Sequence, residues 1–328
     1  MTYVQSEGSE KSPLVSIALT TYKRPEYLKI TMASILEQTL GDFELIVSDN
    51  ANSPEVARIC KEFDDARIRY IGREPSLSMV SNAKSSMKLA TGKYIANIHD
   101  DDVLDARFLE TLIHPMEQDD KIGLVFCDFK IIDENGVEDV AVSDQNSKFS
   151  GRADLAEGVL PHRADAFVTS VIPQPSGRLF RAGSIDLDEI CEEAGGHLDL
   201  WMSFLHCKSA FECYYVPERL ASYRVHAGSA TSLGALKDGE SAAFVFSYVL
   251  THQSFPEKNQ IIGKKLLRSS FRGAIFHLLL GENAEARAGL IKAFRLTGSV
   301  RCIMAYLFAF LPSGLTRPTL KAILHFRK

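Results

Sequence analysis

Three consecutive carboxylates follow a predicted strand and are the clearest candidates for chemistry in this chain. Asp100–Asp102 comes directly after His99, at the end of the apolar segment 93–98. Adjacent carboxylates repel one another and raise each other's pKa, a cost that a divalent cation between them would remove. Such oxygen ligands suit Mg²⁺ or Mn²⁺, which commonly bind one or two carboxylates together with substrate phosphates. A solvated acidic turn, or an N-cap for a helix starting near Ala106, fits the same residues and stays open.

Predicted strands and helices alternate along the first hundred residues, and the acidic cluster lies at the end of the last of these strands. Short apolar, β-favouring runs predict strands at 14–19, 43–47, 68–71 and 93–98. Helical spacing of apolar residues predicts helices at 26–38, 54–63 and 80–90. This order predicts an α/β fold with a mainly parallel central sheet and helices on both faces. Ligands of such sheets bind beyond the carboxyl ends of the strands, where the loop 20–25, the loop at Asp49 and the acidic cluster would meet.

The second half of the chain is less regular. A strand is predicted at 122–132, and the polar segment 143–165 is expected to be a mobile loop region. From about residue 239 the pattern is helical to the end, with segments at 242–252, 258–280, 284–295 and 300–311.

Composition excludes several classes of protein. Hydrophobic residues make up 45% and charged residues 24% of the 328, as in ordinary soluble proteins, and the net charge of −5 argues against a protein that coats nucleic acid. The six cysteines show neither CxxC pairs nor zinc spacing and are expected to be reduced. The polar N-terminus lacks the apolar stretch of a signal peptide, which predicts a cytoplasmic protein. The longest apolar run, 302–312, is about half of what a membrane span needs.

Several segments together resemble the family 2 glycosyltransferases. Between residue 13 and about 105 they occur in unbroken order: PLVSIALTTYKRP (13–25), SILEQT (34–39), ELIVSDNA (44–51), Asn82 with ATGKYI (90–95), and HDDD (99–102). Looser resemblances are PSGRLFR (175–181), LDLW (198–201) and YRVHAGSAT (223–231). The resemblance implies the A-type, Rossmann-like nucleotide-sugar fold. It also implies metal-dependent transfer of a sugar, with inversion, from a nucleotide diphosphate to a hydroxyl acceptor.

The resemblance further implies a set of donor contacts: Thr20, Thr21, Tyr22, Arg24, Asp49, Asn82 and Asp100. The residues of the first loop would line the base and ribose, Asp49 would accept a hydrogen bond from the base, and Asp100 would bond the ribose hydroxyls. Simpler interpretations remain, since Thr20 is also a suitable helix cap and Asp49 is also typical of an ordinary turn.

The expected metal site departs from the family pattern at one position. The family usually reads Asp-x-Asp-Asp, whereas this chain has His99 first. The resemblance implies that Asp101 is the principal metal ligand and that Asp102 orients the ligands, leaving His99 as a neutral neighbour or a ribose contact. It also implies His226 as a second protein ligand, which favours Mn²⁺ over Mg²⁺, and Arg224 as a contact to the pyrophosphate. A structural role for His226 is the alternative.

The resemblance places the catalytic base at the start of a helix. Asp199 is retained there, and His197 replaces the acid that usually serves. Asp199 is preferred; His197 is the alternative because its pKa lies near neutrality, and helix capping by Asp199 is the structural interpretation. An acceptor-side rim is expected from Gln174, Ser176, Gly177 and Arg178. Trp201 would stack on a sugar ring, with core packing as the favoured alternative.

These inferences predict three regions: a flexible N-terminus (1–12), a nucleotide-sugar-binding and catalytic domain (13–235) and a helical C-terminal region (236–328). The preferred donors are UDP- and dTDP-sugars, and the acceptor is a glycan, a lipid-linked glycan or a small molecule. The basic, apolar tail from Arg295 suggests peripheral contact with the inner membrane face, with packing on the domain or in a homodimer as the alternative. Rival functions are a nucleotidyltransferase, disfavoured because the loop 20–25 is not Gly-rich, and a silent nucleotide-sugar-binding module.

Overall fold

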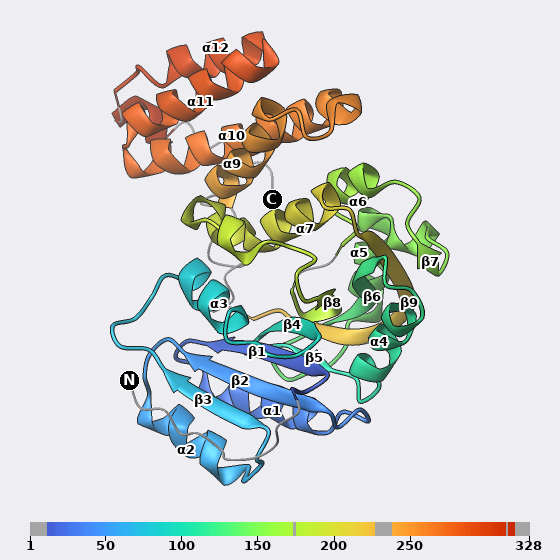
Figure 1. Cartoon of the computed structure of the whole chain (residues 1–328). Coiled ribbons are helices and arrows are strands. Elements are labelled where there is room, and N and C mark those ends of the chain that lie inside the picture. The colour runs from blue at the N-terminus through green and yellow to red at the C-terminus, as the bar shows by residue number, and fades with distance from the viewer. Residues whose placement is uncertain (1–11, 173–174, 227–237, 313, 319–328) are drawn as a thin grey trace. The chain divides into compact units, whose positions relative to one another are not determined.

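The computed structural model describes residues 12–172, 175–226, 238–312 and 314–318. The chain divides into two compact units, one formed by 1–192 with 202–226 and the other by 193–201 with 227–328. The first contains the sheet and the second contains the C-terminal helices (Figure 1). Whereas the sequence suggested a division after residue 235, the units divide after residue 226, and 193–201 is also grouped with the helices.

The first unit is built on a sheet whose strand order is β3-β2-β1-β4-β8-β6-β9-β5, with β7 paired to β9. Its strands are β1 (Val15–Thr21), β2 (Phe43–Asp49), β3 (Ile68–Gly72), β4 (Tyr94–His99), β5 (Val103–Leu104), β6 (Ile122–Ile132), β7 (Gly158–Val159), β8 (Arg178–Arg181) and β9 (Glu212–Arg224). The ladders joining β3, β2, β1 and β4 are all parallel, as the sequence predicted, and β6 pairs parallel with β9. Strands β8, β5 and β7 pair antiparallel with their neighbours, so the whole sheet is mixed.

Helices cover both faces of the parallel half of the sheet, which confirms the predicted α/β class (Figure 1). One face is lined by alternate residues of the strands, such as Ile17 and Leu45, which form a buried core with residues of three helices. These helices are α1 (Pro25–Leu36), α2 (Pro54–Glu62) and α4 (Phe108–Gln118). The other face contacts α3 (Met79–Met87), where the Ser48 hydroxyl donates to Asn82 Oδ1 over 2.7 Å.

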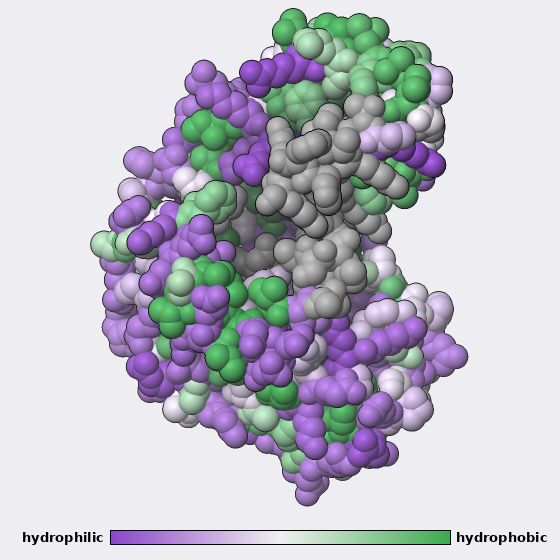
Figure 2. Space-filling model, turned by 180° about the vertical axis from the view of Figure 1, so that it is seen from behind, coloured by the Kyte–Doolittle hydropathy of each residue, from purple (hydrophilic) through white to green (hydrophobic). Residues whose placement is uncertain are grey.

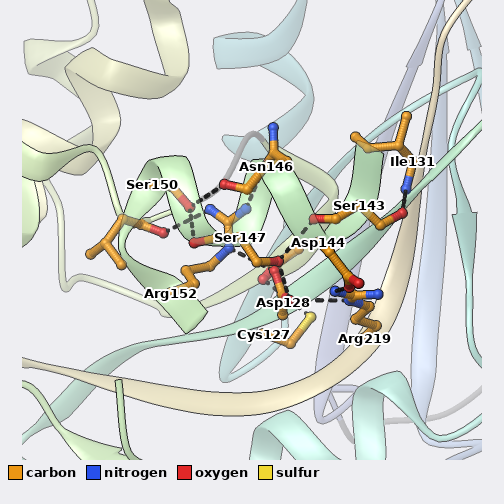
Figure 3. Close-up of polar contacts among 12 residues, drawn as sticks. Cys127, Asp128, Ile131, Ser143, Asp144, Asn146, Ser147, Ser150, Arg152 and Arg219 are labelled. Carbon is orange, nitrogen blue, oxygen red and sulfur yellow. Dashed lines mark hydrogen bonds and ion pairs between the residues drawn. The ribbon is translucent and has the colours of Figure 1, made fainter. Parts of the chain in front are cut away.

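The polar segment 143–165 is not the loop region that its composition predicted. It contains most of α5 (Val140–Ser150), followed by η1 (Arg152–Asp154), β7 and the start of α6 (Arg163–Thr169). The Asp139 side chain caps α5 by accepting from the Val142 N–H over 3.0 Å. Instead of apolar residues, the helix presents buried hydroxyls to β6: Ser143 accepts from the Ile131 N–H, and Ser147 donates to Asp128 (Figure 3). The segment therefore lacks the apolar periodicity by which a helix is recognised.

The remaining described elements lie between β7 and the C-terminal region or within that region. They are η2 (Pro175–Gly177), η3 (Leu187–Glu189), η4 (Glu192–His197), α7 (Leu198–Lys208), α9 (Asp238–Thr251), η5 (Pro256–Lys258), α10 (Asn259–Leu280), α11 (Asn283–Thr297) and α12 (Val300–Phe308). A small core that includes Leu278 and Leu290 joins the last helices. Within the described residues, none of the helices combines the length and the apolar character that a membrane crossing requires.

Candidate active site

The parallel register brings the predicted loops to one edge of the sheet. Thr20 on β1 lies beside His99 at the end of β4, and Thr21 lies beside Asp49 at the end of β2. Because these strands run in the same direction, the loops that follow them project from the same edge. The acidic cluster, residues 99–102, thus lies next to the loop that follows β1 (the first-strand loop, expected at 20–25), as the sequence predicted.

Arg24, at the N-cap of α1, neutralises part of the acidic cluster. Its Nη1 lies 2.8 Å from Asp101 Oδ2 and 3.3 Å from Asp100 Oδ1. The Tyr22 N–H donates to the other oxygen of Asp100 over 3.1 Å. The two carboxylates are buried, so these contacts replace part of the hydration that they lose. The sequence predicted Arg24 as a donor contact but offered no indication of its ion pairs.

Three side chains of the cluster could together hold a metal ion. Among the described residues, His99, Asp101 and Asp102 offer donor atoms that all lie within 4.8 Å of one another. The Nε2 atom of His226, just after β9, lies 3.1 Å from Asp101 Oδ2. Two carboxylates and an imidazole are a donor set that accepts Mn²⁺ or Mg²⁺. The structure therefore brings Asp101, Asp102 and His226 together and adds His99.

Asp102 is the most deeply enclosed member of the cluster. Burial, followed by the charge of Asp101, raises its pKa to about 7, and the same two causes raise the pKa of Asp100. Its carboxylate accepts the Ser176 hydroxyl and, over 3.1 Å, the Arg224 N–H. Carboxyl groups whose pKa is shifted by burial together with a specific charged neighbour recur at functional sites.

Two residues of α1 support the cluster without having been predicted. The Thr31 hydroxyl lies 3.0 Å from the Asp100 carbonyl and 2.7 Å from that of Asp102, so it can fix the backbone between them. The Tyr27 ring packs against the His226 ring with centroids 4.8 Å apart. Both lie on a helix whose spacing signals only core packing, so the sequence offered no means of recognising them.

Two of the predicted donor contacts stabilise local structure. The buried Asp49 carboxylate accepts the N–H groups of Ala51 and Ser53 over 2.9 and 2.6 Å, together with the Tyr70 hydroxyl over 3.1 Å. Asn82 is bonded to Ser48 through both ends of its amide. The ordinary-turn interpretation therefore describes the geometry of Asp49, and a contact between Asp49 and the base stays a prediction.

Arg224 is buried among carbonyl oxygens. Its Nε donates to the Asp101 carbonyl over 2.8 Å, and its Nη1 lies 3.1 Å from the Asp133 carbonyl and 3.2 Å from that of Glu134. These bonds hold the chain around the acidic cluster. The contact to a pyrophosphate that the resemblance implied remains a prediction.

An acceptor-side role for Ser176 and Gly177 stays a prediction. Ser176 is bonded to Asp102 and belongs to the acidic cluster, and Gly177 lines a small pocket beside it. Arg178 has 0% exposure and donates to Ser203 on α7 over 3.0 Å, so a position on an open rim is wrong for this side chain. Gln174 lies outside the described residues.

The predicted base and the single tryptophan belong to the second unit. His197 ends η4, and Asp199, in the first turn of α7, is largely buried. Trp201 is 2% exposed, with its ring centroid 5.5 Å from that of Phe244 and 4.9 Å from that of Tyr248. Stacking on a sugar is therefore corrected to core packing for Trp201, while the role of Asp199 or His197 as base stays a prediction.

A carboxylate cluster at the strand ends of such an α/β sheet is typical of enzymes that bind nucleotides through a metal ion. Residues 16–167 match the family model described as Glycosyl transferase family 2. Over 133 residues the chain is 39% identical to an uncharacterized glycosyltransferase of Methanocaldococcus jannaschii. This match covers 39% of this chain and 46% of that relative. This segment of the chain is therefore similar to glycosyl transferase family 2.

Two further proteins give the context of this assignment. Over 137 residues the chain is 28% identical to the Escherichia coli UDP-Glc:alpha-D-GlcNAc-diphosphoundecaprenol beta-1,3-glucosyltransferase, covering 42% of this chain and 54% of the relative. The matches thus span about half the length of the two curated relatives. The structure of S. aureus TarS 1–349 in complex with UDP-GlcNAc superimposes with a TM-score of 0.66 at 13% identity, over 96% of this chain and 92% of that one. This likeness shows that the fold is shared.

Proposed function

We propose that the chain is a metal-dependent inverting glycosyltransferase that moves a sugar from a nucleotide diphosphate to a hydroxyl group. The observation that carries the proposal is the convergence of His99, Asp101 and Asp102 at the end of β4, beside the first-strand loop. The match of residues 16–167 to a glycosyltransferase family model supports the reaction class.

The residues of the cluster fit a divalent ion. Their donor atoms lie within 4.8 Å of one another, and burial, followed by the charge of Asp101, raises the pKa of Asp102. Asp101, Asp102 and His226 would hold Mn²⁺ or Mg²⁺, and His99 extends the donor set. When bound, the ion supplies positive charge that stabilises a departing diphosphate.

The donor and acceptor form the finer part of the proposal. UDP- or dTDP-sugars are the preferred donors, and the relatives support uridine: the E. coli enzyme is named for UDP-Glc, and the TarS structure contains UDP-GlcNAc. The acceptor is a hydroxyl group of a glycan, a lipid-linked glycan or a small molecule. Direct displacement requires one base, which takes the proton of that hydroxyl, and Asp199 is preferred over His197 for this role.

A thermal-shift screen of nucleoside diphosphates, with and without Mn²⁺, tests the donor and metal parts. A ligand that binds only the folded protein raises its melting temperature, so UDP or dTDP with Mn²⁺ should do so more than either alone. If both fail while GDP succeeds, the donor preference is wrong. Hydrolysis of a panel of nucleotide sugars tests the reaction: slow, metal-dependent nucleotide release supports a transferase, whereas binding without turnover on any donor and acceptor supports the silent module.

A further inference from the structure

Helix α12 has apolar residues on two opposite sides. Cys302 is buried with 0% exposure on the side that faces the neighbouring helices. Val300, Met304 and Leu307 are 67%, 70% and 61% exposed, and residues three or four apart share one face of a helix. A helix that is apolar all round is normally buried, so this exposed face lacks a partner among the described residues.

The exposed face continues beyond the end of α12. Phe310 and Leu311, just past the helix, are also exposed. Figure 2 shows hydrophobic side chains gathered on the surface of the C-terminal helices, at the top of that view. Contiguous apolar surface of this kind marks a site of interaction with a protein or a membrane.

The charge of the same segment indicates which partner fits. Residues 286–328 contain eight Lys and Arg and no Asp or Glu, although the whole chain carries a net charge of −5. Three of these cations, Lys292, Arg295 and Arg301, are exposed on α11 and α12. Basic residues that flank an exposed apolar face complement a surface of anionic headgroups over an acyl layer.

A second copy of the chain fits this surface less well. A two-fold interface brings the same patch of both copies together, so Arg301 and its basic neighbours would approach the identical cations of the other copy. Such juxtaposition of like charges is unfavourable, whereas anionic lipid removes the repulsion.

From these observations we propose that the exposed face of α12, with Phe310 and Leu311, docks on the surface of an anionic lipid bilayer. The apolar side chains enter the boundary between headgroups and acyl chains, and the cations of α11 and α12 contact the headgroups. Because α12 has only nine residues, it would lie on the membrane without crossing it.

Flotation of the full-length protein with vesicles tests this surface. Binding should be strong to vesicles containing about one third phosphatidylglycerol, weak to pure phosphatidylcholine, and reduced by high salt. Met304→Glu with Leu307→Glu should lower the partition coefficient by about tenfold or more, since two apolar contacts are lost. Arg295→Gln with Arg301→Gln should weaken binding to anionic vesicles alone. Phe149→Glu is the matched control, because Phe149 is 84% exposed but lies on α5 of the other unit.

Melting temperature and hydrolysis of a soluble donor should be unchanged in all these variants, which separates this proposal from that of the catalytic site. The proposal is overturned if the wild type binds no vesicles, or if the Met304 and Leu307 variant binds as the wild type does. It is equally overturned if light scattering shows a dimer in solution that this variant, but not Phe149→Glu, converts to monomer without lipid.

Discussion

Arg24 Nη1 lies 2.8 Å from Asp101 Oδ2, the oxygen that His226 Nε2 also approaches. A carboxylate expected to bind a metal ion is therefore neutralised in part by a cation of the chain itself. The arginine precedes α1, whereas the carboxylate follows β4, so this contact joins two loops of the predicted crevice. A bound metal ion would compete with the guanidinium for the same oxygen.

Replacing Arg24 should make the stability of the protein depend more strongly on a metal ion bound at the acidic cluster. Arg24→Gln removes the countercharge of two buried carboxylates, so the metal-free protein should lose roughly 1–3 kcal/mol of unfolding free energy. Mn²⁺ should then raise the melting temperature of the variant more than that of the wild type. Arg58→Gln is the control, because its ion pairs lie on the surface. If Mn²⁺ raised the melting temperatures of the wild type and both variants equally, this role of Arg24 would be contradicted.

The pKa of Asp102 predicts how the stability of the metal-free protein depends on pH. In the folded state this pKa is raised to about 7, above the ordinary value of 3.8, so folding favours the protonated form. The contribution of the Asp102 carboxyl group to the free energy of unfolding is therefore fully present below pH 3.8, and it is lost as the pH rises through about 7. Melting in EDTA from pH 5 to 8 should therefore show a steeper loss for the wild type than for Asp102→Asn. Parallel curves would show that Asp102 does not titrate in this range.

The buried ion pair between Asp128 and Arg152 should be essential for stability. The two side chains approach to 2.7 Å (Figure 3). Burial raises the pKa of Asp128, but bonds from Ser147 and Arg152 outweigh it and the net shift is downward. The contribution of the Asp128 carboxylate to the free energy of unfolding is thus present above pH 3.8, and it is lost as the pH falls through the folded-state pKa of Asp128.

Chemical denaturation at pH 7 measures the contribution of this pair. Asp128→Asn should cost about 3–5 kcal/mol, because it leaves a buried guanidinium without its countercharge. Asp144→Asn, which removes the exposed partner of Arg219, should cost at most about 1 kcal/mol. Similar losses in both variants would contradict the importance given to burial.

Substitution at the predicted base should affect turnover without affecting nucleotide binding. Asp199→Asn is expected to lower kcat for donor hydrolysis by about 10²–10⁴-fold while the Kd for UDP with Mn²⁺ is unchanged. His197→Gln should have the smaller effect, and Glu193→Gln, an exposed carboxylate nearby, should have none. If His197→Gln alone abolishes turnover, the assignment of the two residues must be exchanged.

The sequence was sufficient for the parallel half of the fold and for the position of the acidic cluster. Strands such as β1 and β4 are continuous apolar runs that end in polar loops, and their parallel register alone brings Thr20 next to His99. The positions of residues on adjacent parallel strands therefore follow from the apolar pattern and the order of the elements.

The features that the sequence did not predict depend on contacts between residues far apart in the chain, which local sequence patterns do not reveal. Ser176 was assigned to the acceptor side, yet its hydroxyl reaches Asp102, 74 residues earlier in the chain. Arg178 and Trp201 are polar or amphipathic residues that the tertiary structure buries. Helix α5 was missed because hydroxyls such as that of Ser147 bind it to the sheet through hydrogen bonds. Hydrophobic periodicity identifies only helices that pack through apolar side chains.

At the end of β4, Asp101 is proposed to link a divalent ion to a nucleoside diphosphate. Calorimetric titration of UDP in the presence of Mn²⁺ measures this link directly, with Asp120→Asn as a control whose side chain is 93% exposed. Asp101→Asn should weaken UDP binding by about 100-fold or more and abolish its dependence on Mn²⁺, while the control matches the wild type. Unchanged affinity and unchanged metal dependence in Asp101→Asn would contradict the account.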